Sequence, residues 1–200
     1  MSIKPWKVLS RKRDKSYRIF NLRTDRACSP RTGRAYDFFI LESSPWVNII
    51  PLTDKNEVVM VRQYRHGIQD ITLEIPGGII EGEETPEDTA IRELCEETGY
   101  RTTSELISLG MVYPNPAIQQ NICYSFLAKG AYLAGKQHLD EMEDIETILL
   151  PLSDIPRFIR EGDISHSLVL VAFYRLFIEY EMKMGHVDPH LPNRGTIGGD

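Results

Sequence analysis

The chain has 200 residues, of which 42% are hydrophobic and 26% are charged, and its formal net charge is −6. This length and composition are typical of one globular domain with a sizeable core. The acidic balance disfavours non-specific nucleic-acid binding, and an anionic substrate would need local cations or a metal ion. The N-terminal residues lack the apolar core of a signal peptide, and the longest apolar run, 168–174, is too short to span a bilayer. We therefore expect a cytoplasmic protein with neither a nucleic-acid nor a membrane partner.

Residues 1–45 contain short strand-like runs at 16–22 and 36–41, separated by a turn-rich basic segment at 23–34. This pattern predicts a small antiparallel β element. The basic run at 11–13 could indicate nucleic-acid contact, but the acidic chain as a whole favours a solvated strand end.

Strand-like runs follow at 46–52, 57–63 and 72–75, and the last of them leads into Gly77-Gly78. Two adjacent glycines allow the backbone to come close to a metal ion or a phosphate. A plain tight turn is the alternative interpretation of this pair.

An acid-rich helix is predicted after these strands. Thr85 fits the N-cap, Pro86 the first helical position, and Gly99 the left-handed residue that ends many helices. One face of this helix is predicted to be buried, because apolar residues recur there at helical spacing: Ala90, Ile91, Leu94 and Cys95.

Glu93, Glu96 and Glu97 lie three or four residues apart, and therefore on one side of this helix. Like charges at this spacing repel, and acids in the last turn oppose the helix dipole. A divalent cation would remove the conflict, because Mg²⁺ prefers carboxylate oxygens and keeps waters for a phosphate substrate. A solvated acidic helix face is the alternative.

The stretch from Gly78 to Tyr100 resembles the Nudix box. The fixed positions of the box are all matched, by Gly78, Glu84, Arg92, Glu93, Leu94, Glu96, Glu97 and Gly99. Only Tyr100 stands where the family usually has an aliphatic residue. The resemblance covers residues 46–182 and implies an α+β fold, an α/β/α sandwich with a mixed sheet, to which the N-terminal β element is added.

The same resemblance implies a metal site. Mg²⁺, with Mn²⁺ as a possible substitute, would be held by the box acids Glu93, Glu96 and Glu97 and by the carbonyl of Gly77. Arg92 would hold the acidic constellation in place, pairing with Glu84, and with Glu96 it would serve the catalytic arrangement.

The run at 61–65 before the glycine pair resembles the ADP-ribose pyrophosphatase branch, where an arginine at the place of Arg65 contacts the substrate phosphates. A surface ion pair of Arg65 with Asp70 or Glu74 is the alternative. Trp46 could stack on a nucleobase or belong to the core.

Pro116 falls where that branch carries a proline. Ala117 replaces a usual glycine, and Asn121 stands where a substrate-contacting glutamate is common, so it is our candidate for that contact. These departures leave the preferred sugar nucleotide open, with ADP-ribose first and GDP-mannose next.

The acidic loop at 139–146 is a solvated segment on composition alone. The resemblance implies that one of its glutamates acts as the base on the attacking water. The pattern places this role first on Glu141, second on Glu143 and third on Glu146.

A short helix at 153–161 and a longer one at 165–184 close the predicted Nudix domain, 46–185, and 186–200 form a tail. The expected function is Mg²⁺-dependent hydrolysis of a nucleoside diphosphate sugar, ADP-ribose giving AMP and ribose 5-phosphate. The resemblance implies a homodimer through residues 1–45. A nucleotide-sugar sensor without catalysis and a 5′-triphosphate RNA hydrolase are the other readings.

Overall fold

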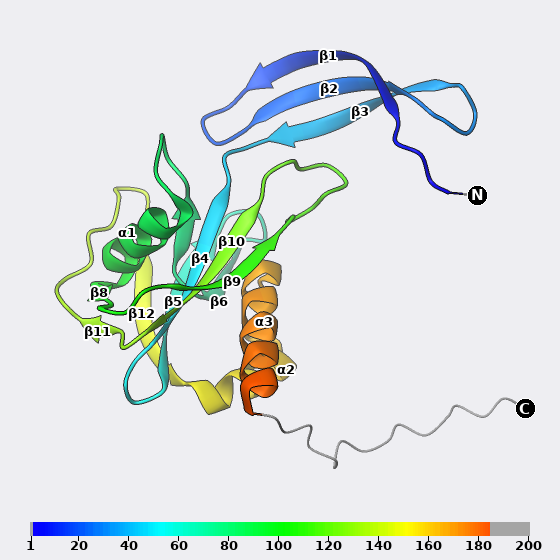
Figure 1. Ribbon diagram of the computed structural model, residues 1–200. Coiled ribbons are helices and arrows are strands. Elements are labelled where there is room, and N and C mark those ends of the chain that lie inside the picture. Colours follow the sequence, from blue (N-terminus) through cyan, green and yellow to red (C-terminus); the bar gives the residue numbers. More distant parts are fainter. Residues whose placement is uncertain (1, 185–200) are drawn as a thin grey trace, which may run out of the picture.

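A mixed sheet is the centre of the molecule (Figure 1). The computed structural model describes residues 2–184, so the predicted tail at 186–200 lies outside the described residues. Within them the sheet has the order β12-β5-β4-β10-β9, with β6 beside β5 and β7 beside β4. β10 runs parallel to β4, and the other pairs are antiparallel. The strands are β4 (Trp46–Leu52), β5 (Glu57–Arg65), β6 (Asp70–Glu74), β7 (Gly77–Ile79), β9 (Ile107–Val112), β10 (Cys123–Lys129) and β12 (Ile145–Pro151).

Helices cover both faces of this sheet (Figure 1). Helix α1 (Pro86–Thr98) packs over a small core that includes Ile49 and Leu94, and α3 (Ser167–Met184) packs over a larger one that includes Phe173. The predicted sandwich and its helices are confirmed. The remaining elements are β8 (Tyr100–Arg101), β11 (Tyr132–Leu133), a 3₁₀ turn (Leu152–Asp154) and α2 (Ile155–Glu161). No described helix is long and apolar enough to cross a membrane.

The N-terminal strands form a separate antiparallel sheet that stands away from the sandwich (Figure 1). Its members are β1 (Lys7–Ser16), β2 (Asn21–Cys28) and β3 (Ala35–Glu42). The amide of Leu41 donates to the carbonyl of Ile118 at 2.7 Å, which ties β3 to the loop between β9 and β10.

Two details of this N-terminal region were predicted wrongly. The run at 16–22 is not one strand: residues 17–20 form the turn between β1 and β2, closed by a bond from the Tyr17 amide to the Phe20 carbonyl. The basic segment expected to be a turn contains most of β2. Charged residues are accommodated in this strand because Arg23 pairs with Asp25 and with Glu42 across the sheet.

Arg175 fixes α3 to the edge of the sheet. Its guanidinium donates to the carbonyls of Leu109 at 2.6 Å and Met111 at 2.9 Å. Gly110, between them, has φ of 91°, and a Cβ there would lie 2.0 Å from Nη1 of Arg175. A glycine is needed here for both its backbone conformation and the space that the guanidinium takes.

Candidate active site

Local sequence signals fix the ends of α1, the helix that carries the acids. The Thr85 hydroxyl accepts a bond from the Asp88 amide at 3.1 Å, and Gly99 ends the helix with φ of 72°. Leu94 is buried against the sheet, whereas Ile91 is 45% exposed, so the predicted apolar stripe is narrower than expected. The buried stripe decides which acids of the helix face the sheet and which face solvent.

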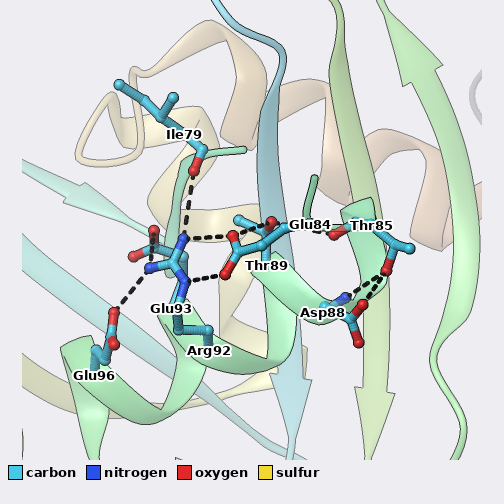
Figure 2. Close-up of polar contacts among 8 residues, drawn as sticks. All are labelled: Ile79, Glu84, Thr85, Asp88, Thr89, Arg92, Glu93 and Glu96. Atoms are coloured by element: carbon cyan, nitrogen blue, oxygen red, sulfur yellow. Dashed lines mark hydrogen bonds and ion pairs between the residues drawn. The ribbon is translucent and has the colours of Figure 1, made fainter. Parts of the chain in front are cut away.

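Arg92 bonds three acidic side chains: Glu84, which precedes α1, and Glu93 and Glu96 on the helix (Figure 2). Its Nε donates to Glu84 at 3.0 Å, and its Nη1 donates to Glu93 at 2.9 Å and to Glu96 at 2.8 Å. Nη2 reaches the carbonyl of Ile79 at 3.4 Å. These carboxylates, Glu84 first, raise the pKa of Arg92. The predicted pairing with Glu84 is present, and the guanidinium neutralises part of the acidic charge.

The glycine pair lies against two acids of the helix, Glu93 and Glu97. The Gly77 amide donates to Oε2 of Glu97 at 3.0 Å. A Cβ on Gly78 would lie 2.1 Å from Oε1 of Glu93, and one on Gly77 would lie 2.4 Å from the Val47 carbonyl. Neither position therefore tolerates a side chain without a shift of its neighbours. The close backbone approach predicted from the sequence is present.

Glu97 is the most buried acid of the helix, with 3% of its surface exposed. Burial raises its pKa to about 8; the Gly77 amide opposes this shift, and the charges of Glu93 and Glu143 add to it. Burial also raises the pKa of Glu93, although Arg92 opposes the shift. Both acids are thus held in a poorly solvated place, where the Arg92 guanidinium donates to Glu93 and the Gly77 amide donates to Glu97.

These acids fit a divalent cation. Among the described residues, no group of three or more His, Cys, Asp or Glu side chains is already arranged as a metal site. Glu96, 41% exposed on its side chain, is instead held by Arg92. The negative charge of Glu93 nevertheless makes ionisation of Glu97 less favourable. Hard cations such as Mg²⁺ prefer carboxylate oxygen. Positive charge placed between them would offset that cost.

The loop acids occupy different surroundings. Glu143 is the loop acid whose charge acts on both Glu93 and Glu97, and its own carboxylate accepts a bond from the Asp140 amide at 3.0 Å. Glu141 is exposed, and Glu146 lies 3.4 Å from Arg62 in an exposed ion pair. The sequence ranked Glu141 first as the catalytic base. The electrostatic interaction with Glu93 and Glu97 instead involves Glu143.

Arg65 is held by a buried acid. Its Nε and Nη2 donate to the two oxygens of Glu74 at 2.7 and 2.6 Å, and the Thr72 hydroxyl donates to the same carboxylate at 2.6 Å. Glu74 has only 4% of its side chain exposed, against 42% for Arg65. The ion-pair alternative raised from the sequence is therefore present. It leaves Arg65 accessible, and its charge acts on Glu97.

A cleft of about 600 Å³ lies beside Arg65 and the glycine pair. Trp46, Arg65, Glu74 and both glycines are among its lining residues, together with His166 at the start of α3. His166, which the sequence assigned to packing, has a buried Nδ1 without a hydrogen-bond partner among the described residues, and burial lowers its pKa. No spacing signal marked this residue, because only the fold brings the start of α3 beside β5 and β6.

The two candidates on the loop between β9 and β10 do not lie with this group. Pro116 is exposed, and Asn121 is 3% exposed with neither amide atom bonded to a described residue. Neither belongs to the described residues that line the cleft. The predicted substrate contacts of Pro116 and Asn121 therefore stay predictions.

Comparison with known proteins identifies the family. The NUDIX domain model matches residues 44–169. An ADP-ribose pyrophosphatase of Bacillus subtilis (strain 168) is 34% identical over 133 residues, covering 66% of this chain and 71% of that protein. A methanol dehydrogenase activator of Bacillus methanolicus is 34% identical over 173 residues, covering 84% and 90%.

A solved structure supports the fold. The crystal structure of an ADP compounds hydrolase superposes with a TM-score of 0.79 at 20% identity, covering 94% of this chain and 100% of that one. The box residues gathered on α1, the sandwich around them and the matched domain lead to one conclusion. The chain belongs to the Nudix family, as a pyrophosphohydrolase that resembles the ADP-ribose pyrophosphatase branch.

Proposed function

We propose that this enzyme hydrolyses the pyrophosphate of a nucleoside diphosphate sugar, and that ADP-ribose is its substrate, giving AMP and ribose 5-phosphate. One observation carries the proposal: Gly77 and Gly78, which line the same cleft as Arg65, lie directly against the buried acids Glu97 and Glu93. Acids suit a metal ion, and an accessible guanidinium suits phosphate oxygens. ADP-ribose is chosen because relatives from Bacillus subtilis and Mycobacterium tuberculosis are ADP-ribose pyrophosphatases.

Glu93 and Glu97, with Glu96 and the carbonyl of Gly77, would hold Mg²⁺, or Mn²⁺ in its place. When bound, the ion would neutralise phosphate oxygens and lower the pKa of the attacking water. Arg92 would hold the Glu84 and Glu96 side chains in place, and its hydrogen bonds to both support this role.

Glu143 is the base in this proposal, ahead of Glu141. The charge of Glu143 acts on Glu93 and Glu97, which supports a place for its carboxylate near the proposed metal site. A base works only within hydrogen-bond reach of the proton that it takes. The variant Glu143→Gln should therefore lose most turnover, and Glu141→Gln should lose little. The reverse result would restore the order given by the sequence.

Arg65 would bind the phosphates with the part of its guanidinium that faces the cleft, while Glu74 holds the other part. Trp46, which is half-buried and lines the cleft, would stack on the nucleobase. The variant Arg65→Ala should raise KM more than it lowers kcat. An unchanged KM would return Arg65 to a purely structural ion pair.

The N-terminal sheet would form a homodimer. It exposes large apolar side chains, among them Trp6, Phe38 and Phe39, and Trp6 packs against Phe38 with ring centroids 5.3 Å apart. An exposed aromatic group of this kind is typical of a protein interface. Light scattering of the full chain and of the Phe39→Asp variant tests this part, which predicts a dimer that the variant dissociates.

A second candidate is another sugar nucleotide such as GDP-mannose, because Ala117 and Asn121 depart from the pattern of the ADP-ribose branch. Product analysis separates the candidates: ADP-ribose, GDP-mannose, a dinucleoside polyphosphate and 5′-triphosphate RNA are incubated with the enzyme, with and without Mg²⁺. Metal-dependent release of AMP and ribose 5-phosphate is the expected result. Tight binding of a nucleotide sugar without cleavage would instead indicate a sensor, and cleavage of the RNA would contradict the substrate class.

A further inference from the structure

The acidic loop between β11 and β12 is fastened at its base by one side chain. Nε2 of Gln137 donates to the carbonyl of Glu97 at 2.6 Å and to that of Ile145 at 3.1 Å, and it lies 3.1 Å from the Thr147 hydroxyl. Its two hydrogens are thus shared among three acceptors. Gln137 joins three places at once: the last turn of α1, the beginning of the loop and the start of β12.

Backbone bonds from the same loop complete the end of α1. The amide of His138 donates to the Glu96 carbonyl at 2.8 Å, and the amides of Ala134 and Gly135 donate to the Gly99 carbonyl at 2.9 and 3.1 Å. The last carbonyls of a helix have no partner within the helix. The loop supplies partners here, so the helix of the box acids and the base of the loop are one connected unit.

The residues beyond this anchor are different. Asp140, Glu141, Glu143 and Asp144 are all exposed, and exposed loops move unless something holds their ends. The charge of Glu143 nevertheless acts on Glu93 and Glu97. A misplacement of about 1 Å at a reacting centre can cost about 100-fold in rate. The loop therefore needs a fixed base if Glu143 is to take a proton from water.

We propose that Gln137 is a positioning residue that holds the base of the loop at 138–144 against the end of α1, and so fixes where Glu143 lies with respect to the helix that carries the box acids. This rests on the proposed function, because it takes Glu143 as the base. Gln137 touches no substrate in this account. It acts through the bonds to Glu97 and Ile145, which fix the two ends of the loop with respect to the metal-binding helix.

The test is a double-mutant cycle on ADP-ribose hydrolysis. Gln137→Leu should lower kcat about tenfold, as losing a partner of a metal-site residue typically does, with KM nearly unchanged. In the Glu143→Gln background the same substitution should lower kcat no further, since the group that it positions is gone. Lys136→Leu puts the same side chain one residue earlier, on an exposed position, and should leave kcat unchanged.

Gln137→Glu is a second variant, in case Gln137→Leu does not fold. It keeps the length of the side chain and, when ionised, lacks both donor hydrogens of the Gln137 amide. It should reproduce the fall in kcat in a protein with a normal circular dichroism spectrum. The proposal would be overturned if the Gln137 substitution lowered kcat by the same factor in the wild type and in the Glu143→Gln background. It would also be overturned if both Gln137 variants had wild-type kcat. Wild-type turnover of Glu143→Gln would instead show that the assignment of the base has failed.

Discussion

The two sides of α1 treat their acids in opposite ways. On the solvent side, Glu96 and the preceding loop residue Glu84 share the guanidinium of Arg92, which makes four hydrogen bonds between 2.8 and 3.1 Å when Glu93 is included. On the sheet side, Glu97 has the Gly77 amide as its hydrogen-bond donor among the described residues. On the solvent side the protein supplies a cation, the Arg92 guanidinium. On the sheet side no guanidinium or ammonium group bonds Glu97 among the described residues. An external cation is therefore expected where Glu97 lies.

The largest effect should come from removing an acid on the poorly paired side. Glu97→Gln should lower kcat by at least about 100-fold, because it removes a metal ligand and even the partners of ligands cost 10–100-fold. The fold should persist, and without metal the melting temperature should not fall, since a buried unpaired charge is costly. Steady-state kinetics and thermal melts measure both.

Glu87→Gln is the matched control for that variant. Glu87 is exposed in the first turn of α1, and its substitution should leave kcat within error of the wild type. Wild-type turnover of Glu97→Gln would remove this acid from the catalytic machinery and would erase the contrast between the two sides.

A smaller effect is expected where the glycine pair gives Glu93 its space. Gly78→Ala places a Cβ within 2.1 Å of the Glu93 carboxylate, so the acid must move. We expect about a tenfold loss of kcat and about 1–3 kcal/mol of destabilisation, as overpacking typically costs. Gly135→Ala, which meets open space, should do neither. Equal kinetics for both variants would show that the position of Glu93 is not critical.

On the well-paired side, removing the cation should act mainly on stability. Arg92→Met leaves its acid partners without their shared cation, and should cost about 1–2 kcal/mol, less than a fully buried pair because the side chain is 29% exposed. Arg157→Met, which breaks an exposed pair with Glu161, should cost under about 0.5 kcal/mol. Urea unfolding measures both, and equal costs would mean that the cluster is no tighter than a surface pair.

The smallest effect is the pH dependence from Glu74. Burial raises the pKa of this acid, but the bond and charge of Arg65 and the Thr72 hydroxyl outweigh it, so the pKa lies below its ordinary value. The ionised form is thus favoured by folding, and its stabilisation is lost as pH falls through the folded pKa. Between about pH 6 and pH 3 the wild type should therefore lose more stability than Glu74→Gln. Parallel losses would show that Arg65 and Glu74 are not coupled in solution.

Much of this contrast could be predicted from the sequence, because it is local. The caps at Thr85 and Gly99, the spacing of the acids and the glycine pair are short-range signals with a direct physical meaning. Helix α1 and the pairing of Arg92 with Glu84 follow from them. The sandwich did not follow from these local signals; the resemblance to the Nudix box implied it.

Contacts between distant segments could not be predicted in this way. Glu74 was only one of two possible partners for Arg65. The strand register places Asp70 opposite Arg65, yet the guanidinium bonds the buried Glu74, so position along the strands does not decide the partner. His166 and Gln137 gave no signal, since each is a single polar residue that the fold brings beside a distant element. The run at 16–22 was misread because its apolar residues serve a turn, in which the Tyr17 and Phe20 rings pack at 4.8 Å.

The central claim is that the largely buried acids Glu93 and Glu97 of α1 bind a divalent cation. Calorimetric titration of Mg²⁺ into the wild type and into the Glu93→Gln, Glu97→Gln double variant tests it directly, with Glu87→Gln as the control. We predict saturable binding to the wild type and to the control, and none to the double variant at the same concentrations. Equal binding to all three proteins would contradict the account and place the metal elsewhere.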